Sequence, residues 1–495
     1  MKIGLRYNSK YHIYERKRRM GMKGKQRMSW LPMACLMLLL GVMSMAIPSK
    51  AASADDFEYF YDGDDEYENQ TWSITKYTGS DTEVTIPSEY DGRPVTGIAS
   101  GAFTDCKNLK RIRIPASVTY ISAPLGGDLE SITVDEGNPK YYSEGNCLIE
   151  RSSKTLVQGW KTSVIPNTVT SIGESAFSGC KNLVGMTIPN SVTSIEINAF
   201  SDCESLKSVS ISGTVTNIEQ SAFRGCDNLT TFTVDKENPA YYVEDNCLIT
   251  KNDQILLFGW KGAKISKNVK KVAEGAFAGN TSLEEITLPA NIAWSYGMFY
   301  NCTNLKKVVA EDGVTSIPDF HGCTSLKEIT IPSGVTTIGS FIDCTSLENI
   351  TIPNGVKTIG RFIDCTGLKN ITIPDSGILI GGFENCTSLK EITIPGSATY
   401  SYSANAFKDC TSLEKVVVES GAGMFPCFSG CTSLESVTIP DSVTWIGGFK
   451  DCTSLKGITI PSKVTWVGDF TGCTSLKEIT IPKGVTTIGN FNGCT

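Results

Sequence analysis

The chain has 495 residues, enough for about three ordinary domains, and a composition that is 40% hydrophobic and 20% charged excludes a disordered protein. The formal net charge is −7. Beyond residue 50 no stretch forms the basic stripe that a nucleic-acid binder requires, so we expect no nucleic-acid partner.

Residues 1–54 predict a secretory signal peptide. Basic clusters such as ERKRRMGMKGK precede the apolar run WLPMACLMLLLGVMSMA, and a small-residue cleavage site follows at Ala52-Ser53-Ala54. The apolar run is short for a membrane span and nothing comparable follows, so we expect a secreted or cell-surface protein with no span in the mature chain. Removing residues 1–50 leaves 34 basic and 51 acidic residues, a net charge of −17.

Residues 55–105 predict an N-terminal β cap and a first repeat. The segment FEYFYDGDDEYENQTWSITKYTG has the β-rich composition of strands that lead into the repeats. Its acidic run, DGDDEYEN at 62–69, invites a calcium site, but the run lacks the D-x-D-x-D-G order of a calcium loop. A solvated acidic cap is the favoured interpretation, and no metal is expected.

Residues 106–495 consist of tandem repeats. The decapeptide CTSLKEITIP occurs at 323–332, 386–395 and 473–482, and repeat cysteines are spaced by 23 residues early in the chain and by 21 later. In one unit, Leu326, Ile329 and Ile331 follow an L-x-x-I-x-I strand pattern that Pro332 ends. A unit of 21 residues cannot bury its apolar face alone, so neighbouring units must stack with parallel strands about 4.8 Å apart.

The motifs L-x-x-I-x-I-P, V-x-x-I-G and A-F-x-x-C resemble the leucine-rich repeats of the BspA type, as found in Treponema and many gut bacteria. The resemblance covers residues 56–495. It implies a mainly β fold: a leucine-rich repeat solenoid with parallel, in-register strands, rungs of 21–23 residues and two elaborated repeats that contain a β-hairpin. It also implies adhesion to host or matrix proteins, or to neighbouring cells.

The two elaborated repeats are expected at about residues 126–179 and 226–279. Their inserts, 133–160 and 233–260, lie 100 residues apart, and in the first we expect Leu148-Ile149 to pair with Leu156-Val157. Trp160 and Trp260 then occupy the Leu position of the next rung. The chain stops inside a unit at NFNGCT, for which truncation is the favoured explanation.

The repeat cysteines predict a column of buried thiols. In-register Cβ atoms about 4.8 Å apart with parallel directions are poorly placed for disulfides. Asn280 replaces cysteine in one unit, as expected if the position needs a small group that bonds to nearby backbone. Scattered disulfides or a metal site are the less favoured alternatives. Cys427 lies outside the column and is the best candidate for a reactive or paired thiol.

No catalytic constellation is evident, so we expect neither an enzyme nor a cofactor. His321 is the sole histidine beyond the signal peptide. Its proximity to Cys323 invites a Cys–His interpretation, but other rungs carry Ile342, Ile363 or Thr471 at the same place, which favours a solvated turn histidine. Phosphate-loop, H-E-x-x-H and G-x-S-x-G motifs are missing from the sequence.

One candidate binding surface is the exposed face of the strands, where horseshoe repeat proteins usually bind on their concave side. The alternative is a solvated face without a partner. Its candidate residues are Lys327, Glu328, Thr330, Thr351 and Thr372.

The other candidate surface is an apolar stripe at the fifth residue after the strand-ending proline. This position is polar in most rungs and returns to Thr487 at the end. Over five consecutive rungs it is Leu379, Tyr400, Met424, Trp445 and Trp466. Contiguous exposed apolar residues indicate a docking surface for a protein or glycan, and partial burial by neighbouring side chains is the alternative.

The function that we expect is therefore non-enzymatic binding or adhesion outside the cell, with a protein or glycan partner such as a host matrix protein. A recognition module of a larger surface enzyme or cell-wall protein, and a structural spacer, remain alternatives.

Overall fold

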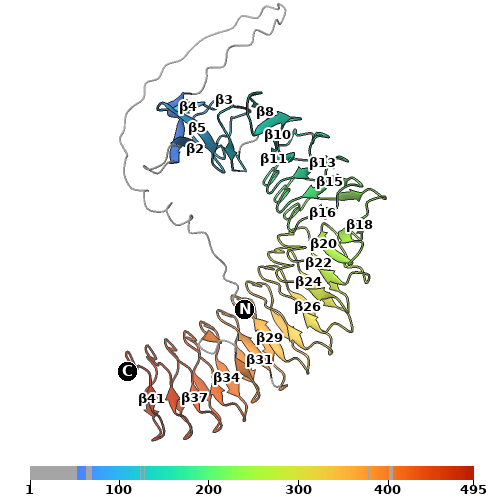
Figure 1. Cartoon of the computed structure of the whole chain (residues 1–495). Helices are drawn as coiled ribbons and strands as arrows, with labels where there is room; N and C mark the ends of the chain where they lie inside the picture. The colour runs from blue at the N-terminus through green and yellow to red at the C-terminus, as the bar shows by residue number, and fades with distance from the viewer. Residues whose placement is uncertain are drawn as a thin grey trace, which may run out of the picture. The chain divides into compact units, whose positions relative to one another are not determined.

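Each repeat folds into one rung with two β-strands joined by tight turns (Figure 1). The computed structural model describes residues 53–62, 70–122, 124–126, 129–376, 378–400 and 405–494. The predicted signal peptide lies outside these residues except for Ser53 and Ala54, and so does nearly all of the acidic run at 62–69. The described residues contain no α-helix, only the 3-10 turn η2 (Ala54–Asp56), and none of their helices is long or apolar enough to cross a bilayer.

The first strand of a rung is the L-x-x-I-x-I segment. Its residues alternate between exposed and buried, as in β13, because successive side chains of a strand point to opposite faces. The first strands are β3 (Glu83–Thr85), β6 (Arg111–Ile114), β8 (Ser131–Val134), β13 (Gly185–Ile188), β15 (Ser208–Ile211), β17 (Thr231–Val234), β22 (Glu285–Leu288), β24 (Lys307–Ala310), β26 (Glu328–Thr330), β28 (Asn349–Thr351), β30 (Asn370–Thr372), β32 (Glu391–Ile394), β34 (Lys415–Val418), β36 (Ser436–Thr438), β38 (Ile458–Thr459) and β40 (Ile479–Thr480).

The second strand of a rung is shorter and follows the proline turn. Most second strands have two residues, an exposed or half-buried one followed by a buried Ile or Val. They are β5 (Arg93–Ile98), β7 (Tyr120–Ile121), β12 (Ser171–Ile172), β14 (Ser194–Ile195), β16 (Asn217–Ile218), β21 (Lys271–Val272), β23 (Ala293–Trp294), β25 (Ser316–Ile317), β27 (Thr337–Ile338), β29 (Thr358–Arg361), β31 (Leu379–Gly382), β33 (Thr399–Tyr400), β35 (Met424–Phe425), β37 (Trp445–Ile446), β39 (Trp466–Val467) and β41 (Thr487–Ile488).

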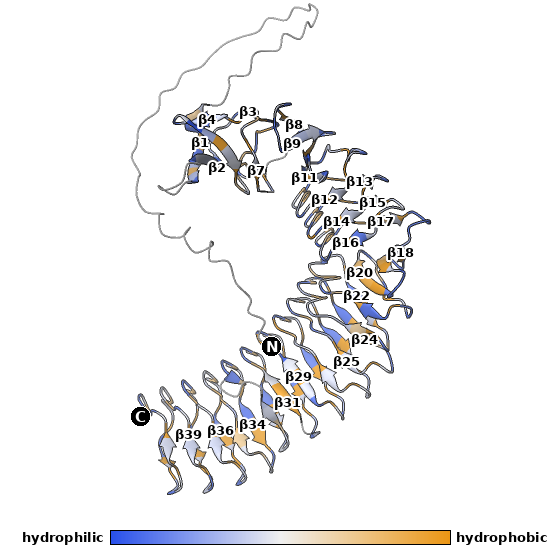
Figure 2. Cartoon of the chain, in the orientation of Figure 1, coloured by the Kyte–Doolittle hydropathy of each residue, from blue (hydrophilic) through white to orange (hydrophobic). Residues whose placement is uncertain are grey.

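Equivalent strands of successive rungs pair in parallel and in register. Asn349 pairs with Asn370 and Ile350 with Ile371, while Thr337 pairs with Thr358 in the second strands. Figure 2 shows hydrophobic and hydrophilic segments recurring from rung to rung, as this register requires. The predicted solenoid with parallel, in-register strands is confirmed.

A tight turn precedes each repeat cysteine and selects a particular residue type. The residue before the cysteine has a positive φ, for example 71° at Gly322, 60° at Asp343 and 58° at Asp364. Only Gly, Asn and Asp adopt this left-handed conformation at low cost. Gly322 and Asp343 also donate their backbone N–H groups to Ile342 and Ile363 of the next rung.

The elaborated repeats each add an antiparallel three-stranded meander. In the first, β9 (Tyr141–Glu144) pairs with β10 (Cys147–Glu150), which pairs with β11 (Thr155–Gly159). In the second, the strands are β18 (Tyr241–Glu244), β19 (Cys247–Thr250) and β20 (Ile255–Gly259). The last strand of each meander joins the stack of second strands, because β11 pairs with β12 and β20 with β21.

The expected hairpin exists, but its predicted register is partly wrong. Ile149 pairs with Leu156, whereas a bulge places Gln158, not Val157, opposite Leu148. The buried side-chain amide of Gln158 bonds to the carbonyls of Gly159 and Ala176 and accepts from the Leu125 N–H. The same bulge places Phe258 opposite Leu248 in the second meander, so the shift belongs to both meanders and does not depend on Gln158.

At the N-terminus β1 (Phe57–Asp62) pairs antiparallel with β2 (Thr71–Tyr77), and β2 pairs in parallel with β5 of the first rung. A two-residue strand, β4 (Glu89–Tyr90), turns back on β5. Ile74 and Tyr77 of β2 are buried against the first rung. The strands therefore cover apolar surface that the first rung would otherwise expose.

The apolar interior falls into three clusters that meet at the meanders. Leu148 of β10 belongs to the N-terminal cluster, together with Trp160. Ile149, the next residue of β10, belongs to the middle cluster. Leu248 and Ile249 divide the middle and C-terminal clusters in the same way. A strand buried on both faces thus partitions the core at each meander.

Candidate functional site

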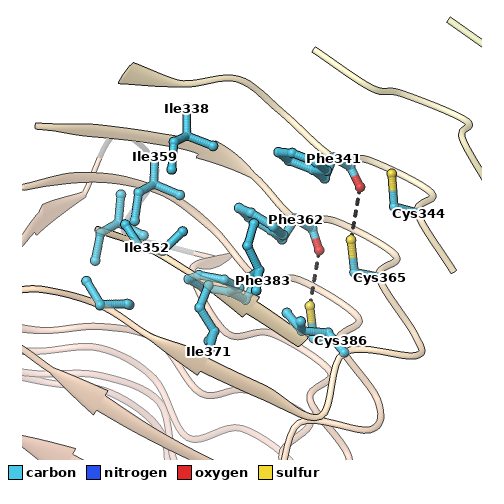
Figure 3. Packing of buried hydrophobic residues seen from close by; sticks show 14 of the residues in the cluster. Ile338, Phe341, Cys344, Ile352, Ile359, Phe362, Cys365, Ile371, Phe383 and Cys386 are labelled. Atoms are coloured by element: carbon cyan, nitrogen blue, oxygen red, sulfur yellow. Dashed lines mark hydrogen bonds between the residues drawn. The ribbon is translucent and has the colours of Figure 1, made fainter. Parts of the chain in front are cut away.

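The cysteine column is a structural device that links each rung to the one before it. The Cys365 sulfhydryl donates to the Phe341 carbonyl at 2.9 Å, and Cys386 donates to Phe362 at 3.1 Å (Figure 3). The same bond recurs at 3.0–3.4 Å in ten further rungs. At the exceptional position Asn280 donates its amide to the Gly259 carbonyl at 3.1 Å, as the sequence predicted.

Every described cysteine is a free thiol, and the column thiols are almost all buried. Burial raises the pKa of Cys365, and likewise that of Cys473, from 9.0 to about 12, so these thiols stay protonated and unreactive at neutral pH. Within the described ranges no group of three or more His, Cys, Asp or Glu side chains is placed to hold a metal ion.

Cys427 lies outside the column, as expected, and two further cysteines do so as well. Cys147 in β10 and Cys247 in β19 also lie outside it, fully buried, with sulfur atoms near the carbonyls of Val164 and Lys264. Cys427 is buried too, 3.1 Å from the Ser429 hydroxyl. Its burial does not favour a reactive thiol.

His321 is half-buried, so the prediction of a solvated turn histidine is wrong. Its ring lies 4.6 Å from the Tyr300 ring, and its Nε2 atom is buried with no partner among the residues that the structure describes. Burial lowers the pKa of His321, against the opposing effect of Asp319 and Asp343. The side chain packs like the isoleucines at the same place in the next rungs.

The first-strand face brings the predicted residues Lys327, Glu328, Thr330, Thr351 and Thr372 onto one exposed surface. Thr351 pairs directly with Thr372. Because β26 does not pair with β28, Thr330 is in register with Val309 of the preceding rung rather than with Thr351. The threonine row of this face is therefore interrupted.

Some charges on the first-strand face form ion pairs between rungs. Lys369 lies 2.8 Å from Glu348 and holds the pKa of that carboxyl below its usual range. Other cross-rung pairs are Lys306–Glu284 at 2.8 Å, Lys456–Glu435 at 2.7 Å and Lys307–Glu328 at 4.0 Å. Exposed pairs of this kind contribute little to stability, but they leave a face of alternating and balanced charge.

The apolar stripe lies on the second strands. Met424 pairs with Trp445, Trp445 pairs with Trp466, and Trp466 pairs with Thr487 in the last rung. The two indole rings stack with centroids 4.5 Å apart and planes at 4°. Met424 is 38% exposed and the tryptophans are half-buried, so the stack presents its ring edges to solvent.

Tyr400 does not belong to this stripe, which corrects the predicted set. Thr399 pairs with Leu379, and Tyr400 pairs with the buried Ile380. A shift of one residue along a strand moves a side chain to the other face. Tyr400 packs on Phe407 at 6.5 Å, and burial raises its pKa. Leu379, 38% exposed, is thereby separated from Met424 by a rung that presents threonine.

A threonine ladder runs beside the stripe. Thr465 donates its hydroxyl to the Thr444 carbonyl at 3.2 Å, and Thr486 donates to Thr465 at 3.0 Å. The structure thus reduces the stripe to Met424, Trp445 and Trp466, which we call the aromatic stripe.

Two hollows on the first-strand face were not predicted from the sequence. Both follow an elaborated repeat, where residues 161–166 and 261–266 form no strand and interrupt the sheet of first strands. The first, of about 790 Å³, lies over β13, β15 and β17, and the second, of about 620 Å³, over β22 and β24. The sequence feature that could have indicated these interruptions is the tryptophan, Trp160 or Trp260, that replaces leucine in each interrupted rung.

A family model described as the BspA type leucine rich repeat region matches residues 76–125, 158–252, 260–361, 339–426 and 424–495 in six copies. Comparison with curated proteins finds no match.

Similar solved structures include a leucine-rich repeat protein from Bacteroides ovatus, which is 24% identical over 86% of this chain and 94% of its own, with a TM-score of 0.38. A leucine rich cell surface protein from Faecalibacterium prausnitzii is 23% identical over 87% and 94%, with a TM-score of 0.30. The pneumococcal vaccine antigen PcpA is 16% identical over 89% and 98%, with a TM-score of 0.35.

Proposed function

The chain belongs to the BspA-type leucine-rich repeat family, and from this premise we propose that it is a secreted or cell-surface binding protein without enzymatic activity. Its repeat surface would contact a protein or glycan outside the cell, such as a host matrix protein. The leader-like residues 1–54 and the net charge of −17 that remains without residues 1–50 support an extracellular setting. The protonated, buried thiols and the packed His321 support the absence of catalysis.

The observation that carries this proposal is the aromatic stripe. Most rungs place Ser, Thr or Asn at this position, so the fold does not require an aromatic residue there. Tryptophan is the residue type most enriched at binding hot spots because it offers a large, rigid contact area. Two adjacent tryptophans and an exposed methionine on one flat face therefore favour a docking surface over a purely structural one.

The test replaces both tryptophans by the residue that neighbouring rungs carry. The Trp445→Thr/Trp466→Thr variant should lose about tenfold or more in affinity for at least one ligand that the wild type binds in an array of matrix proteins and glycans. A Thr337→Ala/Thr358→Ala variant, altered at the same position of distant rungs, is the matched control. Circular dichroism and the urea unfolding midpoint check that both variants fold. Equal binding by a folded double variant would exclude the stripe as the binding surface.

One observation favours a structural spacer as the second candidate. Cross-rung pairs such as Lys369–Glu348 satisfy some charges of the first-strand face within the molecule rather than leaving them for a partner. A protein that acts only as a spacer would bind none of the matrix proteins and glycans in that array.

A further inference from the structure

The first hollow, over β13, β15 and β17, differs from the aromatic stripe in both place and chemistry. It lies between the two elaborated repeats and is lined mainly by hydroxyl and amide side chains. Its volume of about 790 Å³ lies within the range of small-ligand sites. Buried Ile188 and Ile211 contribute to its floor.

The polar groups of this hollow are available to a ligand. In the described part of the chain, the side chains of Asn167, Thr187, Asn190 and Ser210 have no hydrogen-bond partner, although each lines the hollow. The Ser191 hydroxyl is buried there, also without a partner among those residues. Amides and hydroxyls supply donors and acceptors together, which is what a ligand rich in hydroxyl groups requires.

The strand register places hydroxyl groups of the first hollow at regular intervals. Thr187 pairs with Ser210, and Ser210 pairs with Thr233, so that three hydroxyls form a row with one strand spacing, about 4.8 Å, between neighbours. A row of equivalent groups suits a linear ligand whose own hydroxyls recur along a chain.

Charge selects among such ligands. Asp235 is the one ionisable side chain that lines the first hollow, so an anionic chain finds a carboxylate there and no cation. The second hollow, in contrast, is lined by both acidic and basic side chains. Its residues Lys267 and Thr287 correspond to Asn167 and Thr187, and Lys267 lies 3.8 Å from Glu311 in an ion pair.

We propose that the first hollow binds a neutral oligosaccharide, whose hydroxyls bond to Asn167, Thr187, Asn190 and Ser210 and whose C–H faces contact the apolar floor. This site uses none of the residues of the aromatic stripe and adds a second binding site to the proposed binding function.

The test titrates the full-length protein with cellohexaose, maltohexaose, mannohexaose and xylohexaose in a calorimeter, with hexagalacturonate as the anionic comparison. We expect at least one neutral chain to bind at millimolar or lower concentration. Loss of the two amides in Asn167→Ala/Asn190→Ala should weaken binding about tenfold or more, and Thr187→Val about fivefold. Thr287→Val, the equivalent change in the second hollow, should leave the affinity within about twofold.

The variants alter exposed side chains that have no intramolecular bonds, so their unfolding midpoints should match that of the wild type. The Trp445→Thr/Trp466→Thr variant should keep its oligosaccharide binding even if it loses the ligand of the stripe, which separates this proposal from the preceding one. Three results would overturn the proposal: no binding of any neutral chain, equal binding by the amide variant, or tighter binding of hexagalacturonate.

Discussion

In twelve rungs, one cysteine sulfhydryl donates a hydrogen bond to a phenylalanine carbonyl in the rung before it. That carbonyl also accepts the N–H of the cysteine in its own rung, as Phe341 does from Cys344 at 3.2 Å and from Cys365 at 2.9 Å. Both lone pairs of a buried carbonyl are thus used, which avoids the cost of an unsatisfied group. The thiol is small enough to fit beside the stacked Phe341 and Phe362 rings, whose centroids are 5.0 Å apart.

Removal of this donor should destabilise the C-terminal core. Cys365→Ala leaves a lone pair of the Phe341 carbonyl unbonded and opens a small cavity, so we expect a loss of about 1–2 kcal/mol in unfolding free energy. Urea unfolding followed by the fluorescence of Trp445 and Trp466 measures the change. An unaltered midpoint would mean that the S–H bond makes no net contribution.

The same thiols predict a steep loss of stability in alkali. An unfolded thiol ionises near its ordinary pKa of 9, whereas folded Cys365 retains its proton up to a pKa of about 12. Between these values the unfolded state binds fewer protons, so the unfolding free energy falls as pH rises, by about 1.4 kcal/mol per pH unit for each such cysteine. Unfolding free energies at pH 8, 9 and 10 should show this decline, and Cys365→Ala should reduce its slope. A slope that the substitution does not alter would contradict the assignment.

At the scale of the element, most rungs of 21 residues place a glycine at one corner, whereas Pro318 and Pro426 take that corner in two others. In the shorter rungs the residue after the second-strand isoleucine is Gly339, Gly360 or Gly381, where a Cβ would lie about 2.5–2.6 Å from backbone atoms of the preceding rung. The longer rungs place Glu196 and Glu219 at this corner. At these glycines, the corners of successive rungs approach too closely for a Cβ atom.

Gly360→Ala should therefore destabilise the solenoid by about 2–3 kcal/mol, since the obstructing atoms belong to the backbone and cannot rotate away. Gly457→Ala is the matched control, because a Cβ there meets no atom within 4 Å. Urea unfolding of both variants measures the difference. Similar midpoints for the two would show that the rungs separate at little cost.

Across the whole molecule, the elaborated repeats divide one continuous stack into three cores. In β19 the side chain of Leu248 faces the middle core and those of Cys247 and Ile249 face the C-terminal one. Stability in a repeat array is close to a sum of local terms and contacts between neighbours. A residue that borders one core should therefore act on that core first.

Leu248→Ala should lower the protection of β13, β15 and β17 from hydrogen exchange and leave that of β34 to β39 unchanged. Leu248 is fully buried, and truncation of such a residue costs about 2–5 kcal/mol. Hydrogen exchange followed by mass spectrometry of proteolytic fragments resolves the segments. Uniform loss of protection from residue 160 to residue 494 would instead indicate a single cooperative unit.

The repeat, the parallel stack and the cysteine column could all be predicted from the residues alone. The reason is that the period and the alternation are local patterns that recur in successive rungs. The exchange of Cys for Asn280 even indicated the hydrogen bond that the position makes.

Tertiary structure alone decided features that depend on a single rung. Counting from Pro395 placed Tyr400 in the stripe, but strand pairing starts one residue earlier there and turns the ring inward. The packing of His321 on Tyr300 is another contact that no repeated pattern encodes. The bulge opposite Leu148 recurs opposite Leu248, but it depends on pairing within the meander, which the alternation of residues did not reveal. The aromatic stripe and the hollows depend on rungs that depart from the repeat. For this reason the shared period predicted the solenoid better than it predicted these candidate binding surfaces.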